Sequence, residues 1–121
     1  MKSILLVLIV SLFSVNALAL NCHGTEPFWS AEVSDEKVDF LDFDDKVQST
    51  RITEVKAASG FTSSFMQIYV NARGPVAVVT SNTCSDSMSD FAFPKEIILF
   101  TDMGVRYGCC GEGVLPEGGS Y

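Results

Sequence analysis

Four cysteines constrain this chain more than any other feature, because two of them are adjacent. Cys109 and Cys110 follow each other near the end of the last apolar run, while Cys22 and Cys84 lie far upstream. Adjacent cysteines rarely bond to each other, because the small ring strains the peptide between them. Neighbouring side chains of a strand point to opposite faces. We therefore expect two bridges, in which Cys22 and Cys84 each pair with one of the adjacent cysteines.

The first nineteen residues have the pattern of a secretory signal peptide. Lys2 supplies a positive start, residues 4–15 are almost purely apolar, and small residues end the run at Ala17 and Ala19. This apolar run is shorter than the roughly 20 residues of a membrane span, so we expect cleavage after Ala19 rather than an anchor. An even number of cysteines behind a signal peptide is typical of an oxidising compartment. The sequence thus predicts a periplasmic or secreted protein with no stable membrane span.

Length limits the number of domains, and charge limits the kind of partner. Removal of residues 1–19 from the 121-residue chain leaves 102 residues, enough for one domain over residues 20–111 and a glycine-rich, flexible tail over 112–121. Loss of Lys2 lowers the net charge from −7 to −8. An acidic protein should not bind nucleic acid through simple electrostatics. The acidic charge would suit a cationic protein or peptide as partner. The alternative is that the acidic surface is only solvated and binds no partner.

The mature chain reads as short strands separated by turns. About seven strands at roughly ten-residue spacing predict an all-β fold, a small antiparallel barrel or sandwich stapled by disulfides. The apolar runs at residues 76–80 and 97–100 predict strands buried on both faces. Residues 85–93 are the exception, since their serine and aspartate residues predict one short helical turn that Pro94 ends.

The segment from Gly24 to Trp29 is the first that could carry chemistry. Glu26 stands between a glycine and the bulky pair Phe28 and Trp29. A carboxyl group beside a tryptophan can have a raised pKa, which is one way to build a general acid. The alternative is structural, with Glu26 accepting backbone hydrogen bonds at the start of a strand.

The segment from Cys84 to Asp90 is the second that could carry chemistry. Asp86 and Asp90 flank Met88 and two serines, and such an oxygen-rich loop can fold around a cation. The spacing is not that of the twelve-residue calcium loop, and aspartate and serine also cap turns. A soft metal site using cysteine, His23 and Met88, or a redox-active cysteine pair, is a further alternative. We expect structural bridges, no resident metal and no cofactor.

Three motifs together carry a resemblance. Cys-x-Gly-Thr-Glu-Pro-Phe-Trp at residues 22–29, Cys-Ser-Asp-x-Met-Ser-Asp at 84–90 and Gly-Cys-Cys at 108–110 resemble a family of small, uncharacterised bacterial envelope proteins. The resemblance implies an exported or lipid-anchored protein, and relatives sometimes accompany small β-domains linked to envelope stress or lysozyme inhibition. It implies no catalytic residue. Relatives often have glycine at the position of Ser87, so this chain departs from a glycine-dependent turn there.

These observations predict a non-enzymatic exported β-domain that binds a cationic protein or peptide. Inhibition of a lysozyme is the sharpest form of this prediction, with the loop from Asp86 to Asp90 as the inserted element. One alternative is metal or small-ligand binding by Glu26, Trp29, Asp86, Met88 and Asp90. Another is a carboxylate-dependent hydrolase that uses Glu26 and one aspartate. A serine hydrolase is not predicted, because no Gly-x-Ser-x-Gly motif is present and His23 is the only histidine.

Overall fold

The structure, a computed structural model, describes residues 19–25, 27–44, 46–60 and 65–115. Three parts of the sequence predictions therefore lie outside the described residues. They are most of the predicted signal peptide (residues 1–18), Glu26, and the end of the predicted tail (residues 116–121). The described residues form strands and turns and contain no helix. The strands are β1 (Leu20–Gly24), β2 (Trp29–Val33), β3 (Lys37–Leu41), β4 (Val47–Arg51), β5 (Glu54–Ala57), β6 (Met66–Asn71), β7 (Gly74–Thr80), β8 (Cys84–Ser85), β9 (Ala92–Phe93), β10 (Lys95–Thr101) and β11 (Gly104–Cys110).

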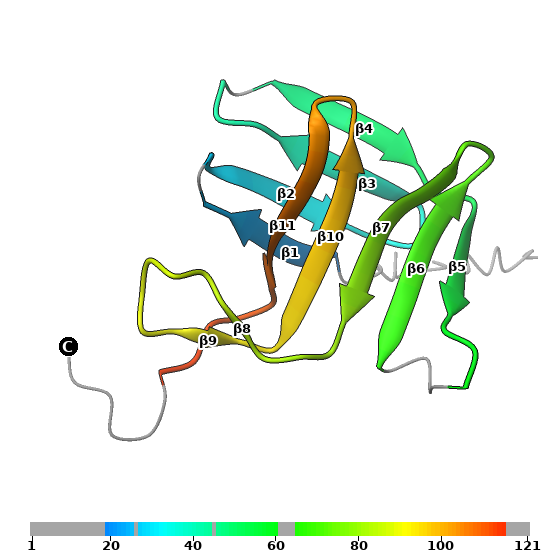
Figure 1. Cartoon of the computed structure of the whole chain (residues 1–121). Helices are drawn as coiled ribbons and strands as arrows, with labels where there is room; N and C mark the ends of the chain where they lie inside the picture. The colour runs from blue at the N-terminus through cyan, green and yellow to red at the C-terminus, as the bar shows by residue number, and fades with distance from the viewer. Residues whose placement is uncertain (1–18, 26, 45, 61–64, 116–121) are drawn as a thin grey trace, which may run out of the picture.

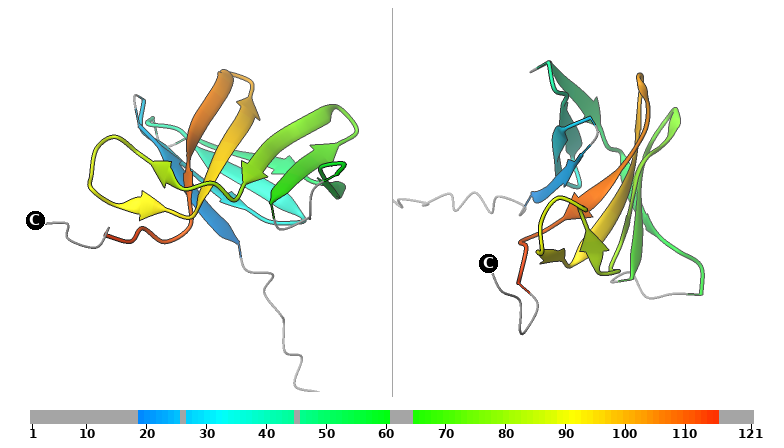
Figure 2. Two further views of the ribbon diagram at one scale, coloured as in Figure 1. Left: turned by 60° about the horizontal axis from the view of Figure 1, so that its bottom comes forward. Right: turned by 60° about the vertical axis from the view of Figure 1, so that its left-hand side comes forward.

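Nine of these strands form one antiparallel sheet in the order β4-β3-β2-β1-β11-β10-β7-β6-β5, and β8 pairs with β9 separately. The sheet curls into a half-barrel, so that β2 to β4 face β10, β7 and β6 across the core (Figures 1 and 2). The predicted all-β, antiparallel, disulfide-stapled fold is confirmed. The sequence predicted about seven strands, whereas the described residues form eleven. Part of the difference arises because residues 48–57 divide between β4 and β5.

The two edges of the sheet approach each other where the chain passes from β4 to β5. Arg51 ends one edge strand and Glu54 begins the other, so only two residues span the gap between them. Asn71 Nδ2 donates to the carbonyl oxygen of Arg51 at 3.1 Å, and the N–H of Thr53 donates to the carbonyl oxygen of Val70 at 2.9 Å. This crossing holds the sheet in its curled shape at one corner.

The core occupies the concave side of the curled sheet. Strand β2 shows the alternation that produces it, because every second residue from Trp29 to Val33 is buried and the residues between are exposed. Residues of both sheet halves meet there. The buried core consists of Cys22, Trp29, Ala31, Val33, Val38, Phe40, Ile52, Tyr69, Val76, Ala77, Val79, Ile97, Leu99 and Cys110.

The two bridges are Cys22–Cys110 and Cys84–Cys109. Cys22 and Cys110 are direct partners across β1 and β11, and both are buried in the core. Cys109 points to the opposite face of β11 and there holds β8 against the sheet. The prediction that each upstream cysteine bonds to one of the adjacent pair is therefore confirmed, and the register of β1 on β11 decides which.

The predicted helical turn over residues 85–93 is wrong. Cys84 and Ser85 pair in register with Phe93 and Ala92, so both ends of the segment belong to a hairpin. Ser87 has a φ of 64°, in the left-handed region that a right-handed helical turn does not use. Val114 also pairs with Ala92, which brings the start of the predicted tail onto the same hairpin.

The prediction that residues 97–100 are buried on both faces is also wrong. Ile97 and Leu99 are buried, but Ile98 is 40% exposed and Phe100 is 44% exposed. Only the concave side of the curled sheet has a second layer, and nothing in the described chain covers the convex side of β10. Residues 76–80 come closer to the prediction, since a register shift opposite Tyr69 leaves both Val76 and Ala77 buried.

The two bridges should stabilise the fold unequally. Cys22–Cys110 spans 88 residues of sequence and Cys84–Cys109 spans 25. On the chain-entropy account, replacing the first pair by alanines should cost about 4–5 kcal/mol and the second about 3–4 kcal/mol. The check is urea unfolding followed by the fluorescence of Trp29, the only tryptophan. Equal losses, or a larger loss for Cys84 and Cys109, would contradict the expectation.

Candidate functional site

The hairpin of β8 and β9 docks on the convex side of β1 and β11, next to the Cys84–Cys109 bridge. His23 Nε2 lies 3.2 Å from Asp86 Oδ2, and Thr25 Oγ1 donates to the carbonyl oxygen of Asp86 at 3.2 Å. The ring of His23 also meets the ring of Phe93 edge to face, with 4.6 Å between centroids. A covalent bond, two polar contacts and an aromatic contact thus fix the hairpin to the sheet.

Asp86 organises the segment between the two short strands, here called the 86–91 loop. Its Oδ1 accepts from the N–H of Met88 at 3.0 Å, and from the N–H and Oγ of Ser89 at 3.1 and 3.2 Å. Desolvation raises the pKa of Asp86, but the hydrogen bonds from Met88, His23 and Ser89 outweigh it and hold the pKa below its ordinary value. One ionised carboxylate therefore shapes the loop and anchors it to β1.

Ser87 takes the left-handed backbone conformation in this loop. Its φ of 64° is one that glycine adopts without a steric cost. The tight turn therefore exists in this chain although serine occupies the position. The N–H of Ser87 donates to Oγ of Ser85 at 3.2 Å, which supports the turn from its other side.

The tip of the 86–91 loop presents apolar side chains to solvent. Met88 is 60% exposed, and Phe91 is exposed to a smaller extent. Figure 1 shows that the loop extends well beyond the edge of the sheet. Of the residues predicted for a site, Asp86, Met88 and Asp90 therefore lie together in one projecting loop.

Trp29 lies on the other face of the sheet. It is only 6% exposed, and its ring packs in the core 5.9 Å from that of Phe40, measured between centroids. The indole covers Gly24 and Gly108, where an added Cβ would overlap the ring. The thickness of one sheet separates Trp29 from the 86–91 loop, and Glu26 lies outside the described residues. The structure thus gives no shared pocket to Trp29 and Asp86.

Sequence inspection did not single out a second polar cluster, centred on Glu96 of β10. Its Oε1 accepts from Thr80 Oγ1 and Asn82 Nδ2, both at 2.8 Å, and its Oε2 accepts from the hydroxyl of Tyr107 at 2.7 Å. The hydroxyl of Tyr107 lies 3.9 Å from Sγ of Cys84. These residues come from four strands and a loop, so only the strand register could have shown that they meet.

The charge states in these clusters do not favour acid catalysis. Hydrogen bonds from Asn82, Tyr107 and Thr80 lower the pKa of Glu96, and the bond to Glu96 raises the pKa of Tyr107. Asp86 has a lowered pKa as well. Both carboxylates stay ionised near neutral pH, whereas a general acid needs a raised pKa. Within the described ranges, no cluster of three or more His, Cys, Asp or Glu side chains is placed to hold a metal ion.

The convex side of β6, β7, β10 and β11 carries a row of apolar residues. Ile68 pairs with Val78, Val78 with Ile98, and Ile98 with Tyr107, so the four lie side by side across four strands. The cross-strand pair of Phe100 and Val105 lies next to this row, toward the β10–β11 turn, and is exposed. We call these six residues the outer apolar face.

The other half of the sheet presents a polar convex side. The residues that point outward from β2 and β3 include Ser30, Glu32 and Asp39, and the cross-strand pair of Leu41 and Val47 at the edge is the apolar exception. Apart from that pair, this half follows the alternation expected of an antiparallel sheet with one face in water, and the half with the outer apolar face does not. The difference marks the outer apolar face as the unusual surface of this molecule.

Comparison of the chain with protein-family models, with curated proteins and with solved structures finds no match. The family resemblance of the three motifs therefore stays a prediction. No helix in the described part of the chain has the length and hydrophobicity needed to cross a membrane.

Asp86 should make the stability of the fold depend on pH. Its folded-state pKa is below the ordinary value of 3.8. The stabilisation is therefore fully present above that value and is lost as the pH falls through the lower folded-state pKa. The free energy of unfolding of the wild type minus that of Asp86→Asn should be positive at neutral pH and should shrink at acid pH. Urea unfolding at a series of pH values measures this difference.

The control is Asp90→Asn in the same loop. Among the described residues, no side-chain hydrogen bond or ion pair to Asp90 is found, so this variant should lower the free energy of unfolding at neutral pH by less than Asp86→Asn. Equal effects of the two substitutions would show that Asp86 does not organise the loop.

Proposed function

We propose that this protein is a non-enzymatic, exported binding domain whose partner is a cationic protein. The outer apolar face is the observation that carries the proposal. Ile98 and Phe100 alternate with buried residues along β10, yet both are apolar where water contact favours polar side chains. A contiguous exposed apolar surface on a soluble domain is typical of a binding site for another protein.

The 86–91 loop supplies a second contact beside the outer apolar face. Tyr107 connects the two, because it belongs to the apolar row and its hydroxyl lies near Sγ of Cys84. The disulfide, the His23 contact and the hydrogen bonds of Asp86 fix the loop before any partner arrives. A preorganised loop loses little conformational entropy on binding, so the exposed Met88 at its tip is an efficient contact.

Charge favours a cationic partner over a second copy of the chain. Fifteen acidic residues against eight basic ones give the chain a net charge of −7. Two such chains repel each other, whereas a basic protein is attracted and its association is accelerated at low salt. A lysozyme is a cationic protein that acts on bacterial cell walls. The resemblance of the three motifs also supports a lysozyme as the partner.

The compartment is part of the proposal. Two disulfides are typical of proteins that fold in an oxidising compartment. The signal-peptide pattern of residues 1–19 supports export to the periplasm or beyond.

The test uses the chain that begins at Leu20 and a c-type lysozyme. The expected results are binding in titration calorimetry at low salt, weaker binding as salt rises, and slower lysis of cell walls by the lysozyme. Absence of both binding and inhibition would refute the lysozyme form of the proposal. A panel of other basic proteins and basic peptides then tests the wider class, and failure across that panel would overturn it.

Simple charge attraction must be separated from a specific surface. The double variant Ile98→Thr with Phe100→Thr keeps every charge and suits a strand, because threonine is β-branched. It should weaken binding by about tenfold or more, since apolar anchors dominate interfaces. Val47→Thr is the matched control, because Val47 is 69% exposed on an edge strand of the polar half. Equal affinities for the double variant and the control would exclude the outer apolar face as the binding surface.

A further inference from the structure

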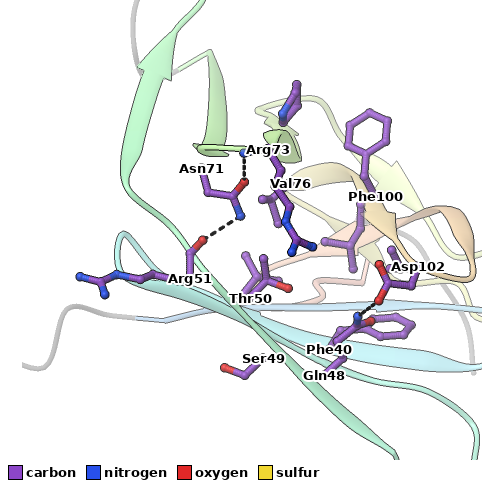
Figure 3. A pocket seen from close by; sticks show the side chains of 14 residues that line it. Phe40, Gln48, Ser49, Thr50, Arg51, Asn71, Arg73, Val76, Phe100 and Asp102 are labelled. Atoms are coloured by element: carbon purple, nitrogen blue, oxygen red, sulfur yellow. Dashed lines mark hydrogen bonds between the residues drawn. The ribbon is translucent and has the colours of Figure 1, made fainter.

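A cleft opens at one end of the half-barrel, where the two halves of the sheet separate (Figure 3). It has a volume of about 360 Å³, within the range of small-ligand sites, and the mouth of a β-barrel is a common place for such sites. Residues of β3 and β4 line one wall, and residues of β7 and β10 with their turns line the other. The cleft is separate from the 86–91 loop, none of whose residues line it.

The floor of the cleft is apolar and already packed. Val38 and Phe40 come from one half of the sheet, and Val76 and Leu99 come from the other. All four belong to the buried core, so the floor keeps its shape without a ligand. Thr50 and Gln48 point inward from β4 and add hydroxyl and amide groups to the wall.

Arg73 places a positive charge in this cleft. It lies in the β6–β7 turn, which is held by a hydrogen bond from the N–H of Arg73 to Oδ1 of Asn71 at 2.9 Å. Arg73 is exposed, and Figure 3 shows its side chain directed into the cleft. Among the described residues, no carboxylate lies within ion-pair distance of this guanidinium. In an acidic chain, a cation without a carboxylate partner that faces a cleft is an available anion ligand.

Two neighbouring charged groups have different roles. Arg51 also borders the cleft, but Figure 3 shows its side chain pointing away from it. Asp102 lies on the same wall as Arg73, and its Oδ2 accepts a hydrogen bond at 2.6 Å from Nε2 of Gln48 on the other wall. This bond connects the two halves across the cleft and engages the carboxylate. The open position for a ligand charge is therefore at Arg73.

We infer that this cleft binds a small anionic amphiphile, with its carboxylate or phosphate on Arg73 and its apolar body over the floor. A guanidinium presents paired N–H donors that match two oxygens of either anion. Pro75, which lines the cleft and is exposed, adds apolar contact beside the edges of the floor residues. This site differs from the one proposed for a protein partner, because Phe100 is the one residue of the outer apolar face that also lines the cleft, and Arg73 is not part of that face.

The experiment compares four probes of equal chain length by titration calorimetry and thermal unfolding. Decanoate and decyl phosphate should bind and raise the melting temperature. Decanol should bind more weakly, and decylammonium should be the weakest, because it places a positive charge near Arg73. The stronger of the two anions identifies the headgroup class.

Three variants locate the site. Arg73→Gln should weaken the binding of decanoate by about tenfold or more and leave decanol unchanged. The affinity of Arg73→Lys for decanoate should fall between those of the wild type and Arg73→Gln, because lysine keeps the charge and loses the paired donors. Arg51→Gln is the matched control at the same rim and should change affinity less than twofold. Circular dichroism confirms that each variant is folded.

Specific outcomes would overturn this inference. They are absence of anion binding, preference for decylammonium, or equal effects of Arg73→Gln and Arg51→Gln. The single variant Ile98→Thr should bind decanoate as the wild type does, because Ile98 belongs to the outer apolar face and does not line the cleft. Loss of decanoate binding in that variant, with none in Arg73→Gln, would place the ligand on the outer apolar face instead.

Discussion

The position of two adjacent cysteines on one central strand is the constraint on which the rest of the structure depends. Strand β11 lies in the middle of the sheet, and its last two residues point to opposite faces. Cys110 joins β1 inside the core, and Cys109 fixes a hairpin outside it. The first bridge stabilises the contact between the two halves of the sheet. The second gives the molecule its only disulfide-held projection among the described residues.

The two halves of the sheet share one core but differ on their convex sides. The half formed by β1 to β4 is polar outside except for the pair of Leu41 and Val47, while the other half carries the outer apolar face. The cost of leaving such a surface in water is offset when a partner covers it. The hairpin, the outer apolar face and the acidic charge support the proposed protein partner, while the Arg73 cleft supports the separate proposal of a small anionic ligand.

Local pattern explains what could be predicted. Alternation in Trp29 to Val33, turns at glycine and aspartate, and cysteine parity predict strands, an antiparallel fold and two bridges, because each depends on neighbours in sequence. The 86–91 loop shows where local reasoning fails. Its serines and aspartates suit a helical turn equally well, and the pairing of Cys84 with Phe93 decides for a hairpin. The cluster at Glu96 and the cleft at Arg73 had no local signal.

By itself, the sequence determined the fold class, the number of bridges and the acidic character. The tertiary structure decided which cysteines pair, which side of β10 is covered, and that Trp29 and Asp86 lie on opposite faces of one sheet. The physical reason is that strand alternation distinguishes two faces without saying which neighbour covers each. Only the register and curl of nine strands assign an apolar residue such as Ile98 to solvent rather than to the core.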